Sequence, residues 1–186
     1  DVPLAPAGAT GGVSTQSAGV WRLCYYANQG DSSRPNFQPA ASDPFVDPNN
    51  GQLLPISGEY FAPAAVAADD YETFPDLILG TKSGGLIYLH NLGDGDGPLF
   101  EIGDLPTLGL GGLSIPFGAP AFFDVDGDTS PDLVIGTQDG RVHYFHNDQT
   151  PDDPPTNTNY PIGPFTEVIG ADNPFSFLSL GQYAAP

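Results

Sequence analysis

Short apolar runs bounded by glycine, proline and aspartate recur along the chain. The clearest three are Pro120–Phe123, Leu133–Gly136 and Arg141–His146. Apolar and β-branched runs of four to eight residues are typical of strands, and the Asp139-Gly140 pair between two of them favours a tight hairpin. We therefore expect a strand, an acidic turn, a second strand, a hairpin and a third strand. No segment has a helical period, so the predicted fold class is all-β.

The same pattern occurs twice in the chain. Residues 61–91 align without a gap on residues 117–147, and both copies contain Pro-Asp-Leu, Gly-Thr and a final His-Asn. Self-similarity over this length indicates a structural repeat. A fourth short strand is expected at Leu99–Ile102 and again at Phe165–Ile169, each after Gly-Pro. Four antiparallel strands per unit are typical of propeller blades, so we expect antiparallel propeller-blade-like repeats.

Both ends of the sequence resemble half of such a unit. Arg22–Asn28 is similar to Arg141–Asn147 at the back of a unit, and Gly181–Pro186 is similar to the segment that opens the second copy. The expectation is about two full units plus two half units. Residues 1–30 are expected to be a half repeat that supplies back strands and is a candidate donor segment. Residues 31–91 are expected to form a first repeat with a degenerate acidic turn, and residues 92–147 a second repeat with an intact turn. Residues 148–186 are expected to hold a linker and the front half of a third repeat.

The turn of the second copy concentrates carboxylates. Positions 1, 3, 5 and 9 of the loop, and a backbone carbonyl at position 7, are held by Asp124, Asp126, Asp128, Asp132 and Ser130. Ca²⁺ takes six to eight oxygen ligands, and alternating aspartates on a curled backbone bring such oxygens together. The spacing predicts a calcium site, the alternative being a solvated acidic turn. An EF-hand is excluded because Ile135 stands where that motif requires Glu and because strands flank the loop.

These motifs resemble the FG-GAP/VCBS repeat family, whose calcium-binding blades build propellers such as those of integrin α chains. The resemblance is carried by Phe117-Gly118-Ala119-Pro120, the DxDGDxxxD turn and Leu133-Val134-Ile135-Gly136, and it covers residues 61–91 and 117–147. It implies a calcium-binding propeller-type fold with Asp124, Asp126, Asp128, the Ser130 carbonyl and Asp132 as ligands. The family usually has glycine at the place of Thr129, which implies a strained turn here.

The first copy departs from this ligand pattern. Its ungapped equivalents are Ala68, Asp70, Glu72, the Phe74 carbonyl and Asp76. The first carboxylate is lost and the third has a longer side chain, so fewer charged oxygens can converge. We therefore expect a weaker second site, formed by Asp70, Glu72, Phe74 and Asp76.

Composition narrows the classes of partner. The chain has 4 Lys and Arg against 23 Asp and Glu, a net charge of −19 that would repel nucleic acids and anionic membranes. No apolar run approaches the ~18 residues of a membrane span. The single Cys24 excludes an intramolecular disulfide and a cysteine-based zinc cluster. Asp-rich glycine turns and the absence of Met predict a secreted, processed, extracellular protein; a salt-loving source organism is the alternative explanation of the charge.

No catalytic set is recognisable, so we expect that the protein is not an enzyme. His90 and His146 occupy the same place in the two copies, which favours a shared structural contact over catalysis. Trp21, Tyr25 and Tyr26 are expected to pack in strands and not to form a sugar platform. No Ser/His/Asp set, phosphate-binding loop or paired Glu site stands out.

Three functional classes follow from these features. The preferred one is a calcium-stabilised β-repeat structural protein that self-associates head to tail, as in a surface filament, because the halves missing at its two ends complete each other. The alternative is an adhesin or lectin-like module that is a fragment of a larger β-propeller and binds a glycan or a surface protein. A glycan-cleaving enzyme is permitted by the resemblance, but no residue supports it. The fold alone does not decide among them.

Overall fold

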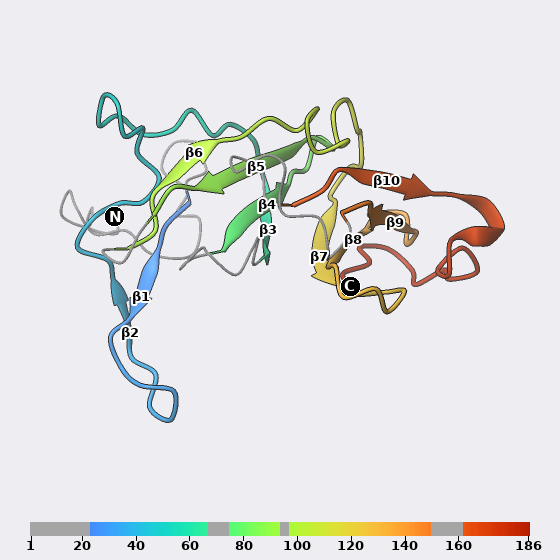
Figure 1. The fold of residues 1–186 in the computed structure, drawn as a ribbon, viewed down its shortest axis with the longest axis horizontal. Coiled ribbons are helices and arrows are strands. Elements are labelled where there is room, and N and C mark those ends of the chain that lie inside the picture. The colour runs from blue at the N-terminus through green and yellow to red at the C-terminus, as the bar shows by residue number, and fades with distance from the viewer. Residues whose placement is uncertain (1–22, 67–74, 94–96, 150–161) are drawn as a thin grey trace.

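The computed structural model describes residues 23–66, 75–93, 97–149 and 162–186, and this part of the chain is all-β, as predicted. Its strands form three antiparallel sheets (Figure 1). The elements are β1 Tyr26–Asn28, β2 Phe37–Pro39, β3 Ala62–Val66, β4 Asp76–Gly80, β5 Leu86–Asn91, β6 Phe100–Ile102, β7 Ala119–Phe123, β8 Asp132–Gly136, β9 Val142–Asn147, β10 Phe165–Val168 and the 3₁₀ turn η1 Gly170–Asp172. Within these ranges there is no helix with the length and hydrophobicity of a membrane span.

Two sheets have four strands each and follow the chain in order. The first is β3-β4-β5-β6 and the second is β7-β8-β9-β10, so the expected fourth strands are present as β6 and β10. Each fourth strand pairs with the strand before it and lies beyond the repeat boundary expected from the sequence, at residue 91 or 147. A structural unit therefore runs from residue 62 to 102, and the next from 119 to 168.

The register of the first strand differs from the ungapped sequence alignment. Ala62 of β3 pairs with the last residue of β4, and Ala119 of β7 pairs with the last residue of β8. Ala62 is therefore equivalent to Ala119, and the alignment of Phe61 with Phe117 is wrong by one residue. The connection after β3 is accordingly one residue longer than the connection after β7. Both registers match apolar residues with apolar residues, which is why the sequence did not separate them.

The short sheet of β1 and β2 matches the third and fourth strands of a unit, and β2 lies beyond the half repeat expected at residues 1–30. Asn28 pairs with Phe37, just as the last residue of β5 pairs with Phe100 and the last residue of β9 pairs with Phe165. The Oδ1 of Asn28 accepts hydrogen bonds from the N–H groups of Gly30 and Asn36, at 2.9 and 2.8 Å. β1 and β2 thus correspond to the third and fourth strands of the complete units; residues 1–22 lie outside the described part.

Two hydrophobic clusters lie on opposite faces of the first sheet. Successive side chains of a strand point to opposite faces. Ile78 and Tyr88 therefore belong to the inter-sheet core, which also contains Leu133 and Phe145 of the second sheet. Leu79 and its neighbours face the other way, into an amino-side core with Phe45, Leu89, Phe100 and, at its margin, Leu23 and Tyr25. The apolar side chains of each sheet thus pack against residues of the neighbouring unit.

The hairpins Thr81–Gly84 and Thr137–Gly140 join each unit to the next. The carbonyl groups of Thr81 and Gly84 accept hydrogen bonds from the N–H groups of Phe117 and Ile115, at 3.1 and 2.8 Å. One unit later, the carbonyls of Thr137 and Gly140 accept from the N–H groups of Ala184 and Leu180, at 3.0 and 3.1 Å. The segment that ends in Tyr183–Pro186 therefore lies against the second unit much as Phe117–Pro120 lies against the first, except that Ala184, the residue after Tyr183, bonds to the hairpin threonine.

An aromatic residue with a left-handed backbone marks the start of each unit. Tyr60, Phe117 and Tyr183 have φ of 53°, 54° and 61°. Their rings follow one another from unit to unit, with centroids 5.7 Å apart for Tyr60 and Phe117 and 5.5 Å apart for Phe117 and Tyr183. A positive φ is uncommon for non-glycine residues and persists where surrounding contacts hold it. The aromatic contacts are such a constraint, and an aromatic residue with this backbone conformation precedes the first strand of each four-stranded unit.

Glycine is required where these unit boundaries meet. A Cβ on Gly80 would lie about 1.9 Å from the carbonyl oxygen of Gly118, and a Cβ on Gly136 about 2.4 Å from that of Ala184. Both neighbours are backbone atoms of the next unit, so neither can move away as a flexible side chain could. The close approach of successive units depends on the absence of a side chain at these two positions.

We expect Gly80→Ala to destabilise the protein by about 1–3 kcal/mol, because the added methyl must push the second unit away from the first. Gly85→Ala is the matched control, since its Cβ would meet only the Thr81 hydroxyl at 3.7 Å and its backbone has no positive φ. Urea denaturation followed by tryptophan fluorescence and circular dichroism measures both. Equal midpoints for the two variants would show that the junction is not tightly packed.

Candidate metal centre

The acidic turn of the second unit connects β7 to β8. Gly127 and Thr129 adopt positive φ values of 88° and 79°, which curl the backbone so that alternate side chains point inward. Thr129 is therefore in the left-handed region where the resemblance implies glycine, and for a β-branched residue this conformation is strained. Asp132, the last predicted carboxylate, is the first residue of β8 and is fully buried.

Backbone N–H groups orient the carboxylates of the turn. Asp124 accepts from Gly127 and Thr129 at 2.7 and 3.0 Å. Asp126 accepts from the N–H of Asp128 at 3.1 Å, and Asp128 accepts from that of Ser130 at 2.8 Å. These charge-assisted bonds hold the side chains in place and offset part of their mutual repulsion.

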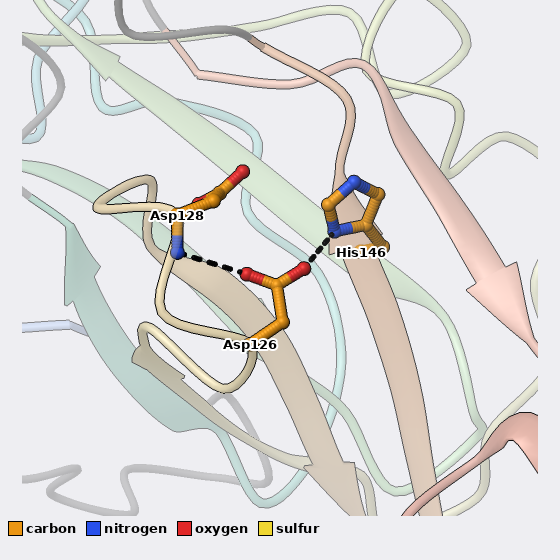
Figure 2. Close-up of side chains that lie close together, drawn as sticks. All are labelled: Asp126, Asp128 and His146. Carbon is orange, nitrogen blue, oxygen red and sulfur yellow. Dashed lines mark hydrogen bonds and ion pairs between the residues drawn. The ribbon is translucent and has the colours of Figure 1, made fainter.

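The predicted aspartates come together in two overlapping groups. Asp124, Asp126 and Asp132 form one, and Asp126, Asp128 and His146 form the other, with the candidate ligand atoms of each group within 4.8 Å of one another. Figure 2 shows the second group: the Asp126 carboxylate lies between the backbone N–H of Asp128 and the ring of His146. Either group could hold a metal ion, with Asp126 common to both.

His146 is the member of this site that the sequence analysis assigned to a structural contact and did not count among the ligands. Its Nδ1 lies 3.2 Å from the Oδ2 of Asp126 and 3.3 Å from the Oδ1 of Asp132. The Nδ1 atom is buried and has no hydrogen-bond partner among the described residues. The sequence did contain a signal. His90 and His146 are each the next-to-last residue of the third strand of their unit, and this strand pairs with the strand that opens with Asp76 or Asp132.

Asp132 also has a structural role that recurs in the first unit. Its carboxylate accepts hydrogen bonds from the N–H of Val125, the N–H of Asn147 and the hydroxyl of Tyr144, at 3.0, 2.8 and 3.1 Å. In the first unit Asp76 accepts from the N–H of Asn91 and the hydroxyl of Tyr88, at 2.6 and 2.5 Å. The buried aspartate thus ties the second strand of each unit to the third.

The histidines share a structural contact, as the sequence suggested. The Nδ1 of His90 lies 3.4 Å from the carboxylate of Asp76, as that of His146 lies beside Asp132. His143, which has no counterpart histidine in the first unit, places its Nδ1 2.7 Å from the Oε1 of Glu167 on β10.

The other residues singled out in the sequence have different outcomes. Ser130 is buried and its hydroxyl donates to the carbonyl of Gln149 at 2.8 Å; ligation by its own carbonyl stays a prediction. Of the weaker second site, Asp76 is the buried anchor described above, whereas Asp70, Glu72 and Phe74 lie outside the described residues, as does Trp21. Tyr25 packs against the amino-side core, but Tyr26 is exposed.

Comparison of the chain with protein-family models, with curated proteins and with solved structures finds no match. The resemblance to FG-GAP/VCBS repeats therefore stays an expectation that rests on the motifs of the chain itself.

The Tyr144–Asp132 contact makes stability depend on pH in the alkaline range. Burial, and then the hydrogen bond to Asp132 and the nearby carboxylates, raise the pKa of Tyr144 well above its ordinary value of 10.0. Folding therefore favours the protonated phenol. Its contribution is fully present below pH 10 and is lost as the pH rises through the folded-state pKa, because only the unfolded chain ionises readily there.

We expect the Tyr144→Phe variant to lose less stability than the parent between pH 10 and pH 12, measured by urea denaturation at a series of pH values. Tyr26→Phe is the control. Because Tyr26 is exposed, its replacement should leave the change of stability with pH the same as in the parent. A parallel decline of all three proteins would mean that Tyr144 ionises as easily in the folded state as in the unfolded state.

Proposed function

We propose that this chain is a non-enzymatic, extracellular structural protein whose β-repeat units are stabilised by Ca²⁺ bound in the turn between β7 and β8. The observation that carries the proposal is the convergence of Asp124, Asp126, Asp128 and Asp132, predicted as ligands from their spacing, into two groups that share Asp126. The protein would serve as a subunit of a head-to-tail assembly at the cell surface.

The donor set supports a hard cation. Carboxylate oxygens predominate, and such oxygens suit Ca²⁺, Mg²⁺ and Mn²⁺ better than metals that prefer sulfur or several imidazoles. A turn that offers several carboxylates without a fixed octahedral frame suits Ca²⁺ better than Mg²⁺. The Nδ1 of His146 makes no hydrogen bond among the described residues and lies beside the carboxylates of Asp126 and Asp132, so it is placed to bind the same cation.

The position of the turn supports a structural role for the ion. Asp124 follows the last residue of β7, Asp132 opens β8 and His146 lies near the end of β9. A cation held by these residues would link three of the four strands of the second sheet. It would also neutralise part of a local excess of negative charge in a chain of net charge −19.

Calcium should raise the melting temperature of the parent protein. A ligand at ~100 times its Kd adds about 2.7 kcal/mol to the free energy of unfolding. Asp126→Asn should abolish most of this shift, because the variant keeps an oxygen to accept the N–H of Asp128 but loses the charge shared by both groups. Thermal melts followed by circular dichroism in calcium and in EDTA measure the effect.

Asp31→Asn is the matched control for this experiment. Asp31 also accepts turn N–H groups, from Ser33 and Arg34 at 2.9 and 2.8 Å, but it lies in the β1–β2 connection. It should keep the full calcium shift. Identical melting of the parent in calcium and in EDTA would refute calcium stabilisation, and an equal shift in magnesium would refute the choice of ion.

Calorimetric titration should reveal one dominant calcium site. Counted back from the buried aspartate that opens the second strand, the first unit has Ala68 where the second has Asp124, so its turn offers fewer charged oxygens. Asp132→Asn should remove the dominant site, whereas Asp76→Asn should change its affinity little. Two sites of equal affinity in the parent would contradict the weaker assignment of the first unit.

A further inference from the structure

Strands β1 and β2 lie at one end of the row of units and the segment after β10 lies at the other (Figure 1), and both carry exposed apolar side chains. At one end, β1 and β2 expose Tyr26 and Phe37, which we call the amino face. At the other end, the last residue of β7 and the segment after β10 expose a larger set, which we call the carboxy face: Phe123, Ile169, Phe177 and Leu180. Ile169 is 72% exposed and Phe177 is 81% exposed, the two highest values among the exposed large hydrophobic side chains of the described residues.

The carboxy face corresponds to a surface that is buried inside the molecule one unit earlier. The N–H of Leu180 bonds to the carbonyl of Gly140 as the N–H of Ile115 bonds to that of Gly84, so Leu180 takes the same place beside the hairpin, although it lies three residues before Tyr183 and Ile115 lies two before Phe117. Ile115 is 4% exposed because the second sheet covers it, whereas Leu180 is 55% exposed. Phe123 likewise ends its strand as the buried Val66 ends β3.

The amino face corresponds to the other half of the same interface. By strand register, Phe37 is equivalent to Phe100 and Phe165, which are 4% and 3% exposed, whereas Phe37 itself is 63% exposed. Tyr26 is two residues before Asn28 and so is equivalent to Phe145, which lies in the inter-sheet core. In each complete unit these positions pack against the preceding unit.

We propose that the carboxy face of one molecule packs against the amino face of a second copy of this chain, in the manner in which the two four-stranded sheets pack within the molecule. Each end carries the half of that interface which the other end lacks. The contact joins two different surfaces, so it is heterologous and each junction leaves one face of each kind free for the next copy. The inference rests on the proposed structural function, for which it names the partner and the surfaces.

Two variants, each blocked at a different face, test this pairing. Phe37→Asp blocks the amino face and Phe177→Asp blocks the carboxy face, while Leu53→Asp is the control because Leu53 is 51% exposed and belongs to neither. Mass in solution is measured by light scattering after size exclusion, over a range of concentrations in calcium. The parent and the control should form oligomers that grow with concentration, and either blocked variant alone should stay monomeric, its association weakened by about 30-fold or more.

An equimolar mixture of the two blocked variants gives the most specific outcome. Phe37→Asp retains its carboxy face and Phe177→Asp retains its amino face, so the mixture should form dimers and nothing larger. A pairing of like faces would instead let one of the blocked variants dimerise alone, which would overturn the proposal. Phe37→Ala and Phe177→Ala repeat the test without an added charge should a charged variant unfold.

Other results would also overturn the inference. These are a parent that is monomeric at every concentration, a mixture that stays monomeric, a loss of assembly in Leu53→Asp, or a parent that assembles only after deletion of residues 1–22, which would assign the amino face to the chain's own segment. The calcium shift in melting temperature is measured on the same samples. A retained calcium shift without assembly removes this inference alone, whereas a lost calcium shift with intact assembly removes the calcium proposal alone.

Discussion

The backbone contact between the hairpin of one unit and the first residues of the next is the constraint on which the rest of this structure depends. Gly80 and Gly136 have no side chain, so backbone carbonyl groups of the following unit can lie in the space that a Cβ atom would occupy. That approach sets the position of β7 beside the first sheet, and the inter-sheet core then fills the space between the two sheets. Because the acidic turn directly follows β7, the same contact also determines where the candidate metal ligands lie.

The buried aspartates show how a fold requirement and a candidate binding site can share one residue. A buried carboxylate is costly unless hydrogen bonds satisfy it, and Asp76 and Asp132 each accept bonds from an asparagine N–H and a tyrosine hydroxyl. This anchor is present in both units, although only the second has the full acidic spacing. The anchor therefore belongs to the architecture, and the additional aspartates of the second turn supply the chemistry that distinguishes it.

Local signals predicted much of this structure, and tertiary pairing determined the rest. Strands β7, β8 and β9 follow from apolar runs and an Asp-Gly hairpin, which need only neighbouring residues. Strand β2 was not expected, because Phe37-Gln38-Pro39 has no alternating pattern and its pairing depends on the loop held by Asn28. The place of His146 beside Asp126 was missed for a related reason, since it arises from the pairing of β8 with β9 and from the curl at Thr129.

Repetition explains why apolar side chains are exposed at both ends of the described row of units. When each unit contacts only its neighbours, an end unit presents the surface that an interior unit buries, unless a polar cap replaces it. Here the end positions keep the aromatic and aliphatic residues of interior ones, as at Phe37 and Leu180. A net charge of −19 on every copy opposes association through long-range repulsion, which salt screens over about 8–10 Å. In the proposed contact between copies, short-range apolar burial would act only once the faces meet, so the charge would favour close complementarity between the two faces over non-specific aggregation.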